Sequence, residues 1–235
     1  MAKTDLTAAD LNKLTEWDTP TICNGLEHIS SEYRVKSFTV EQMQCFDPSL
    51  PPIIGYARTA MIRSMTPPEG KPEDKREMKA RYYETIAAPP KPSISVIQDL
   101  DPNPGFGAFW GELNTAIHKG LGCLGVVTNG SFRDLDACAP DFQLLGGKIV
   151  PSHAWVHLVA IECEVNIFGM AVKPNDIIHA DRHGAVVVPE ECVKELPSAI
   201  DVMTRREAVI LEVARSPGFN IETLKKAMAD SAEIH

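Results

Sequence analysis

In the middle of the sequence an apolar strand follows a short helix with almost no connecting chain, and this pattern constrains the fold more than any other. Residues 112–120 have a helical pattern that Gly120 ends, and the strand 123-CLGVVTN-129 begins three residues later. A turn at Gly130 follows the strand. Short connections between helices and strands are typical of α/β folds. We therefore expect a mixed α/β protein.

The first half of the chain alternates helices and strands whose limits are marked by prolines. Proline cannot donate a backbone hydrogen bond, so proline pairs often stand where an element begins or ends. The predicted elements are two short helices over 7–30 broken at Pro20, a strand over 53–65, a loop over 67–75, a helix over 74–88 and a strand over 93–99. We find no clear linker between two domains.

The second half is rich in strands and ends in helices. Turn residues at 174–175 and 182–184 separate its apolar runs. The predicted strands cover 148–154, 156–169, 171–181 and 184–189, and helices follow from Pro189 with a break at Pro217-Gly218. We expect one domain over 1–235, with a strand-rich core flanked by N- and C-terminal helices. Helices 190–235 should pack on this core or on a neighbouring subunit.

Charge and cysteine content exclude several classes of partner. The formal net charge of -9 argues against nucleic acid, because phosphate backbones bind basic faces. No apolar run reaches the roughly 18–20 residues that a membrane helix needs. The polar segment 1–20 carries acids and is unlike a signal peptide. The six cysteines include no C-x-x-C pair, so we expect reduced cysteines in a cytoplasmic protein.

The dipeptide Arg133-Asp134 is the first candidate for chemistry. It follows the apolar strand and the turn at Gly130, and the ends of strands are where α/β proteins tend to keep their sites. The pair can be an ordinary ion pair that holds a loop. It can equally be a place where an anion and a metal ion are bound together. Residue type and position leave both readings open.

The segment 104-PGFGAFWGE-112 is the second candidate. Its glycines precede the start of a helix, and free N–H groups at a helix N-terminus attract anions. The spacing does not match a dinucleotide fingerprint, and the chain has no G-x-S-x-G nucleophile motif. The segment is either a flexible loop, which we favour from its composition alone, or a carboxylate-binding loop with Glu112 in the first turn of the helix.

The histidines do not suggest a metal site. His153 and His157 lie in a stretch that we expect to be a strand, where residues four apart share a face but lie ~13 Å from each other. They could not bind one ion together. We expect His179 to be a strand residue and His183 to be a solvated turn residue.

Taken together, these motifs resemble those of the RraA-like family, which includes the 4-hydroxy-4-methyl-2-oxoglutarate (HMG/CHA) aldolases. The matching pieces are Gly111-Glu112, 122-GCLGVVTNGSFRD-134 and 174-PNDIIHADRHGAVVVP-189. Twenty residues separate Glu112 from Arg133, as in the acid-x20-Arg-Asp spacing of the family. The resemblance covers roughly residues 10–225 and implies an RraA-like fold of the swivelling β/β/α type.

The resemblance also implies a site and a reaction. In the aldolases the aspartate binds Mg²⁺ or Mn²⁺, the arginine contacts a 2-keto-acid, and backbone N–H groups near the earlier acid bind the substrate carboxylate. An acid from the C-terminal helix of a neighbouring subunit contributes to the metal site, so a homotrimer or homohexamer is implied. Carried onto this sequence, the metal residues are Asp134, Glu112 through water and Glu207 of a neighbouring subunit, and the substrate residues are Arg133, Gly111, Glu112, Leu113 and Asn114.

Two departures from the family pattern leave the substrate open. Asn129 and Ala137 stand where many members have an acid. The regulators in the family, which bind and inhibit a ribonuclease, generally lack the metal-binding aspartate that this chain keeps. We therefore expect a metal-dependent lyase acting on a small anionic keto-acid, by retro-aldol cleavage, by oxaloacetate decarboxylation or by both. The alternatives are a non-catalytic ribonuclease regulator and another enzyme that acts on a ring-derived keto-acid.

Overall fold

The longest strand, β2 (Ile53–Arg63), organises the sheet in the computed structural model of this chain, which describes residues 6–234. On one edge β2 pairs in parallel with β3, which is followed by β4 and β6 in parallel and by β1. On its other edge β2 pairs with β11 in its first half and with β8 in its second half. The bounds are β1 Gln44–Cys45, β3 Ser93–Asp99, β4 Cys123–Thr128, β6 Gln143–Gly146, β8 His157–Ile161, β11 Ile177–Asp181 and β12 Gly184–Val188.

One face of this curled sheet is covered by a separate two-stranded sheet. The hairpin of β9 (Val165–Ile167) and β10 (Met170–Val172) packs across it. The resulting core is aliphatic, and its buried members include Ala57, Val96, Val127 and Ile178. Burial of this apolar area is the main driving force for closing the sheet.

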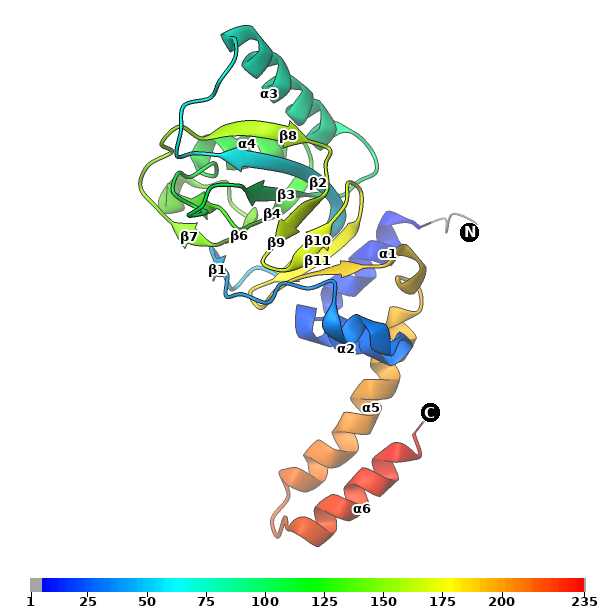
Figure 1. Cartoon of the computed structure of the whole chain (residues 1–235). Helices are drawn as coiled ribbons and strands as arrows, with labels where there is room; N and C mark the ends of the chain where they lie inside the picture. The colour runs from blue at the N-terminus through cyan, green and yellow to red at the C-terminus, as the bar shows by residue number, and fades with distance from the viewer. Residues whose placement is uncertain (1–5, 235) are drawn as a thin grey trace.

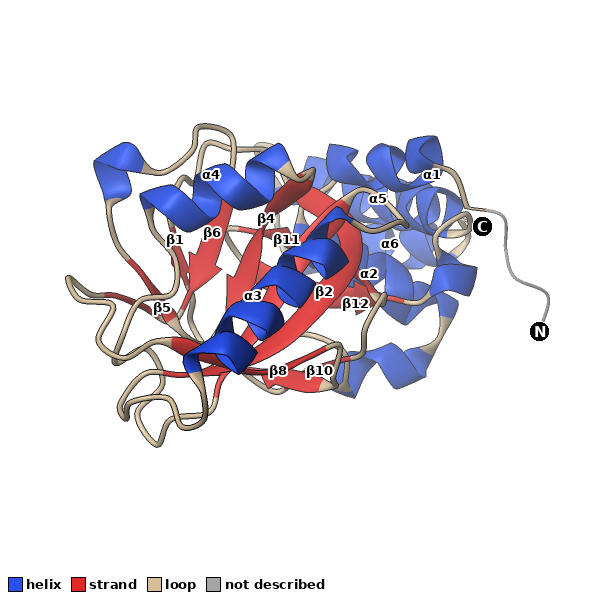
Figure 2. Cartoon of the chain, turned by 90° about the horizontal axis from the view of Figure 1, so that it is seen from above, coloured by secondary structure: helices blue, strands red, loops and turns tan. Residues whose placement is uncertain are grey.

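The other face is covered by α3 (Pro72–Ala87) and α4 (Glu112–Gly120), which lie over the sheet in Figure 2. Tyr82 and Ile86 are the buried residues of α3, and they join the aromatic cluster that contains Trp110 and Phe142. The N-terminal part of α3 extends away from the body of the molecule (Figure 1). This helix is therefore held mainly by its C-terminal half.

The N-terminal helices pack beside β11 and β12. They are α1 (Ala8–Lys13), a short 3-10 turn (Leu14–Glu16) and α2 (Thr19–Ile29). The predicted break at Pro20 is wrong by a few residues: the chain turns at Trp17-Asp18, and Pro20 lies in the first turn of α2, where its missing N–H is not needed. Asp18 caps the helix by accepting the N–H of Thr21.

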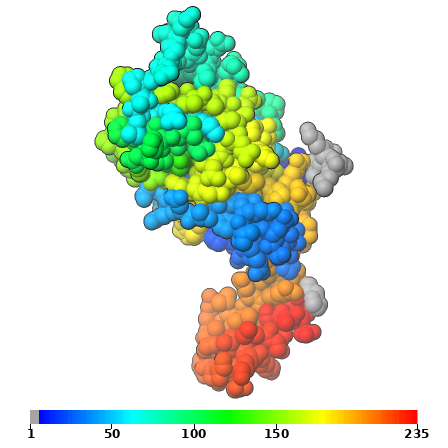
Figure 3. Space-filling view, in the orientation of Figure 1, coloured from blue at the N-terminus to red at the C-terminus, as the bar shows by residue number. Residues whose placement is uncertain are grey.

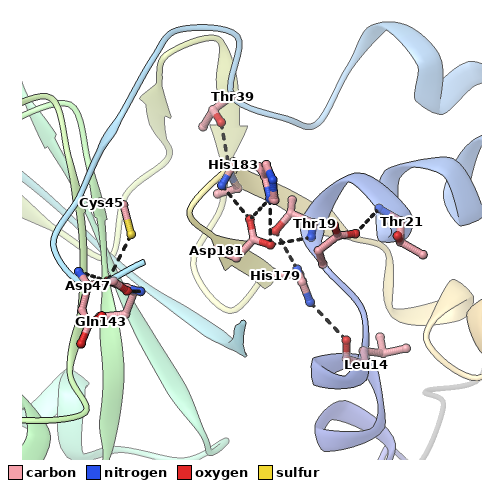
Figure 4. Close-up of polar contacts among 12 residues, drawn as sticks. Leu14, Thr19, Thr21, Thr39, Cys45, Asp47, Gln143, His179, Asp181 and His183 are labelled. Carbon is pink, nitrogen blue, oxygen red and sulfur yellow. Dashed lines mark hydrogen bonds and ion pairs between the residues drawn. The ribbon is translucent and has the colours of Figure 1, made fainter. Parts of the chain in front are cut away.

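A buried polar joint fixes α2 to the sheet (Figure 4). The Asp181 carboxylate at the end of β11 accepts the backbone N–H of Thr19 at 3.0 Å and that of His183 at 2.8 Å. His179 lies within 3.0 Å of the Thr19 hydroxyl and 3.2 Å of the Leu14 carbonyl. Because Leu14 O can only accept, Nε2 of His179 carries the proton and Nδ1 accepts from Thr19.

The C-terminal helices form a hairpin that projects from the body, as Figures 1 and 3 show. The first part of α5 (Leu196–Ala214) packs on α2 through Leu196 and Ile200. Beyond it, α5 packs against α6 (Ile221–Ala232), where Ser231 Oγ donates to the Arg206 carbonyl at 2.9 Å. Large apolar side chains on this hairpin are exposed: Leu211, Phe219, Ile221 and Met228.

Several predicted strands are shorter than expected. Within 148–154 only Lys148–Ile149 (β7) is a strand, paired with β5 (Ser131–Phe132). The predicted strand 156–169 is β8 and β9 separated by a turn, and 171–181 is β10 and β11 with the turn at Asn175 between them. The backbone has positive φ at Ala154, Glu162 and Phe168. These residues seldom adopt that conformation, so the sequence did not signal the turns.

The structure bears on the expectations about membrane helices and cysteines. In residues 6–234 no helix is long and apolar enough to cross a membrane. All six cysteines are free, as predicted. The first five residues of the polar segment 1–20, and His235 at the end of the expected domain, lie outside the described part.

Candidate functional site

A short backbone contact brings the two candidate segments together. Trp110 forms a parallel bridge with Phe132 of β5, and the N–H of Arg133 donates to the Trp110 carbonyl at 3.0 Å. Gly111 then leads into α4, while Arg133-Asp134 leads into a 3-10 turn (Leu135–Ala137). Residues separated by twenty positions in sequence are therefore neighbours at one edge of the molecule.

The Asp134 carboxylate lies at the N-terminus of α4. Its Oδ2 atom is 3.4 Å from the N–H of Glu112 and 3.5 Å from Nε of Arg133. The Asp134 backbone is in the left-handed region, with φ 55° and ψ 42°, a conformation that aspartate tolerates better than most residues. Its carbonyl accepts the N–H groups of Ala137 and Cys138, which fixes this conformation.

Gly111 is required at its position by space. A Cβ atom there would lie 2.5 Å from Oδ2 of Asp134 and 3.3 Å from Cγ of Arg133. The φ of Gly111 is −176°, which any residue can adopt. The glycine therefore serves the close approach of the carboxylate to the helix end and not an unusual backbone conformation.

The Arg133 guanidinium is open to a ligand. Its side chain is 36% exposed and that of Asp134 is 35% exposed. Within residues 6–234 the two terminal amino groups of Arg133 have no hydrogen-bond or ion-pair partner; only Nε contacts Asp134. A guanidinium presents a planar fork of donors that matches a carboxylate. The pair is thus neither closed off in the interior nor saturated by its own contact.

The first turn of α4 offers free backbone donors. The N–H groups of Leu113 and Asn114 have no hydrogen-bond partner in the described part of the chain, as expected for a helix start. The side chain of Asn114, by contrast, is bound at both polar atoms: its Oδ1 accepts from the Tyr83 hydroxyl at 3.0 Å, and its Nδ2 donates to Phe109 O. Leu113 is exposed. In this turn, backbone groups and not side chains are available to an anion.

The predicted metal residues fit a hydrated hard ion. The Glu112 carboxylate is exposed and, within residues 6–234, has no ion pair or hydrogen bond. The described residues contain no group of three or more His, Cys, Asp or Glu side chains that could enclose a metal. Mg²⁺ keeps several of its waters and needs only one or two carboxylates, and Mn²⁺ also favours oxygen ligands. Asp134 and Glu112 offer carboxylate oxygens of this kind, and their role in binding a metal stays a prediction.

Glu207 is not near this pair within one chain. It lies on α5, where it lines a cavity of about 320 Å³ together with Asn24, His28 and Arg206. Figures 1 and 2 place α5 and α4 at opposite ends of the molecule. Only a second copy of the chain could bring a Glu207 carboxylate to Asp134, so its expected role remains a prediction.

The glycine-containing segment before α4 is anchored, against the expectation of a flexible loop. The Asp99 carboxylate accepts the N–H of Gly105 at 2.7 Å, and Ser64 Oγ accepts the N–H of Gly107 at 3.0 Å. Burial raises the pKa of Asp99. Asn129 is bound to Asp99 as well: its side-chain oxygen accepts the backbone N–H of Asp99, and its side-chain nitrogen donates to the Asp99 carbonyl. An ionised aspartate at 129 could not donate the second of these bonds.

The sequence did not predict a buried series of hydrogen bonds that links α4 to α3 and β3. His118 Nδ1 lies 2.6 Å from Asn114 O, and Nε2 lies 2.9 Å from the Tyr82 hydroxyl, which is 2.9 Å from Ser95 Oγ. Burial lowers the pKa of His118 to about 4, so the ring is neutral near pH 7. The spacing of Asn114 and His118 on one helix face was visible in the sequence. The contribution of Tyr82, from a separate helix, was not.

The other histidines behave as structural residues. His153 and His157 each lie near a backbone carbonyl. Only His157 lies in β8, and His153 precedes it, so the expectation that both lie in one strand is wrong. His179 is a buried strand residue, as predicted. His183 is partly exposed and contacts Asp181.

Comparison with known proteins gives a family match and one relative that aligns over part of its length. The model of the RraA-like family, described as Aldolase/RraA, matches residues 19–187, which include both candidate segments. An uncharacterized protein of Methanocaldococcus jannaschii is 33% identical over 107 residues, or 45% of this chain and 51% of that protein. The chain thus matches about half the length of this curated relative.

Solved structures share the fold. An uncharacterized protein from Pseudomonas syringae pv. tomato has a TM-score of 0.72 at 20% identity, covering 98% of this chain and 97% of the other. Streptomyces coelicolor RraAS2, described as an unusual member of the RNase ES inhibitor RraA protein family, has a TM-score of 0.67 at 20% identity, covering 88% and 98%. At this identity the likeness establishes the architecture alone.

Proposed function

Since the chain belongs to the RraA-like family, we propose that it is a divalent-metal-dependent lyase that cleaves a carbon–carbon bond next to a 2-keto-acid. The proposed substrates are 4-hydroxy-2-oxo-diacids and oxaloacetate, and the common product is pyruvate. The observation that carries the proposal is the open guanidinium of Arg133 beside the Asp134 carboxylate at the start of α4.

The donors around this pair suit a keto-acid. The free amino groups of Arg133 can bind the keto and carboxylate oxygens, and the unpaired N–H groups of Leu113 and Asn114 can bind the carboxylate at the positive end of the helix. The Asp134 carboxylate has the same sign of charge as such a substrate, and its contact with Arg133 offsets part of that repulsion; a bound divalent cation would offset the rest. This conflict of charge supports a metal at the site.

The proposed metal is Mg²⁺ or Mn²⁺, held by Asp134 and, through water, by Glu112. When bound, it would supply Lewis-acid stabilisation of the negative charge that develops on the keto oxygen. Preorganised charge stabilisation of this kind is typically the largest contribution to catalysis. Arg133 would add to it, because its guanidinium keeps its proton at all physiological pH values.

Both reactions pass through the same intermediate, the enolate of pyruvate. In the retro-aldol direction a base removes the proton of the C4 hydroxyl, the C3–C4 bond breaks, and its electrons form the pyruvate enolate, which takes a proton from solvent. In oxaloacetate decarboxylation the bond to the distal carboxylate breaks and releases CO₂, leaving the same enolate. Arg133 and the N–H groups of α4 bind the part of the molecule that is common to both substrates.

We further propose that the site is completed in a homotrimer or homohexamer. The projecting hairpin of α5 and α6 exposes Leu211, Phe219, Ile221 and Met228. Exposed apolar side chains gathered in one region can mark an interaction surface. A neighbouring copy that covers the hairpin could receive its Glu207 at the Asp134 site.

The direct test is pyruvate release, followed with oxaloacetate and with 4-hydroxy-4-methyl-2-oxoglutarate in the presence of Mg²⁺ or Mn²⁺. We expect turnover that EDTA abolishes and that added metal restores. Equal rates with and without chelator would reject the metal-dependent lyase. Absence of turnover together with inhibition of a ribonuclease would instead support the regulator that the sequence left as an alternative.

A further inference from the structure

In the buried series of hydrogen bonds that links α4 to α3 and β3, the donor and the acceptor of each bond can be assigned. Asn114 O can only accept, so Nδ1 of His118 carries the proton and Nε2 is the acceptor. The Tyr82 hydroxyl must then donate to Nε2 and accept from Ser95. All four groups are satisfied by a neutral imidazole. The His118 ring, held by Tyr82, thus fixes the backbone carbonyl of Asn114.

A second tyrosine of α3 fixes the side chain of the same asparagine. Tyr83 is half-buried, and its hydroxyl donates to Asn114 Oδ1 at 3.0 Å. The ring of Tyr83 also packs edge-on against His118, with ring centroids 5.8 Å apart. Consecutive residues of α3 therefore hold the carbonyl and the side chain of one residue in the first turn of α4.

The C-terminal ends of the two helices are joined as well. Lys91, just after α3, donates to the carbonyls of Ile86 in α3 and Leu121 at the end of α4. The C-terminal half of α3 is thus connected to α4 at its start and at its end. The rest of α3 is largely exposed.

We propose that Tyr83 is a positioning residue for the substrate carboxylate. This inference rests on the proposed function. Tyr83 acts through the side chain of Asn114, which its hydroxyl binds, and so sets the direction of the free N–H groups of Leu113 and Asn114. The C-terminal half of α3, which carries Tyr83, is therefore part of the machinery that determines how well a keto-acid binds.

The experiment compares Tyr83→Phe with Tyr56→Phe. Tyr56 is a half-buried tyrosine on the other side of the sheet, packed in the N-terminal cluster, and its hydroxyl has no hydrogen-bond partner within residues 6–234. Because one hydrogen bond is lost, we expect Tyr83→Phe to raise KM for oxaloacetate about 3- to 10-fold with kcat changed less than about twofold. Binding of oxalate in Mg²⁺, measured by calorimetry, should weaken by the same factor. The Tyr56→Phe control should show no comparable change in KM or in oxalate binding.

A double-mutant cycle tests the route of the effect. In an Asn114→Ala background, Tyr83→Phe should have no further effect on KM or on oxalate binding, because the group it acts through is gone. Equal oxalate affinity and KM in wild type and Tyr83→Phe would overturn the proposal, as would fully additive effects. Oxalate binding without turnover in the wild type would reject the lyase, and the positioning role would then be judged by binding alone. A wild type that neither binds oxalate nor turns over would overturn both.

Discussion

At the scale of single residues, the candidate site depends on close approach. The Asp134 carboxylate reaches the end of α4 because Gly111 has no side chain, and the left-handed backbone of Asp134 directs it there. The hydrogen bonds from Ala137 and Cys138 to its carbonyl hold Asp134 in that conformation. The sequence suggested Arg133 and Asp134 by type, but it did not reveal this geometry.

Substitution of Gly111 tests this geometry. Gly111→Ala would place a Cβ 2.5 Å from Oδ2 of Asp134, so the carboxylate must move, while the extended backbone at 111 accepts alanine without strain. We expect pyruvate release to fall on the order of 10²-fold, the typical effect of a displacement of about 1 Å. Circular dichroism should show no change in fold.

The matched control for Gly111→Ala lies on the same helix. Gly120→Ala adds a methyl group where nothing lies within 4 Å, so its activity should equal that of the wild type. If Gly111→Ala retained full activity, the position of the Asp134 carboxylate would not matter to catalysis.

At the scale of elements, the sequence predicted those whose limits carry clear chemistry. The range 112–120 matches α4, because Gly120 ends the apolar pattern, and 93–99 matches β3. It failed where non-glycine residues make the turns, as at Glu162 and Phe168. Pairing across the chain was beyond its reach, since the contact of Trp110 with Phe132 that assembles the site depends on tertiary packing.

The connection between α3 and α4 is expected to contribute measurably to stability. Lys91→Met would leave the carbonyls of Ile86 and Leu121 without their donor, although burial lowers the pKa of Lys91 and offsets part of the gain. We expect the free energy of unfolding to fall by about 1–3 kcal/mol in urea titrations.

An exposed lysine provides the comparison for Lys91. Lys225 lies on α6 and pairs with Glu222 at 3.6 Å, a surface contact worth about 0–1 kcal/mol. Lys225→Met should therefore have a much smaller effect. Equal losses for the two variants would show that Lys91 does not join the helices.

At the scale of the whole molecule, two buried histidines should make stability depend on pH. Burial lowers the pKa of His118 and of His179 to about 4, from 6.5 for an exposed histidine. Between these values the unfolded chain binds more protons than the folded one, so stability is complete above pH 6.5 and falls as the pH drops toward 4. The expected loss is up to about 3 kcal/mol per histidine.

Urea unfolding at several pH values between 7.5 and 5 checks this dependence. The raised pKa of Asp99 and of Asp176 acts in the opposite direction near pH 4, so the slope is best measured above pH 5. A His157→Gln variant, which removes a more exposed histidine, should keep the slope of the wild type. Stability that is constant over this range would contradict the neutral, buried state of His118 and His179.

A shared site between subunits predicts complementation. Asp134→Ala and Glu207→Gln should each be inactive alone. When the two are mixed in equal amounts under conditions that exchange subunits, about a quarter of the sites would hold both native residues, so about a quarter of the wild-type rate should return. No recovery after demonstrated exchange would remove Glu207 from the site.

The most direct test of the central claim is the rate of pyruvate release from oxaloacetate by Asp134→Asn, measured across a titration with Mg²⁺. Asparagine keeps the size of the side chain but removes the charge that would hold the cation. We predict that the variant loses at least about 10²-fold in rate at Mg²⁺ concentrations that saturate the wild type, while remaining folded and assembled. A variant with the wild-type rate and the wild-type dependence on Mg²⁺ would contradict the account.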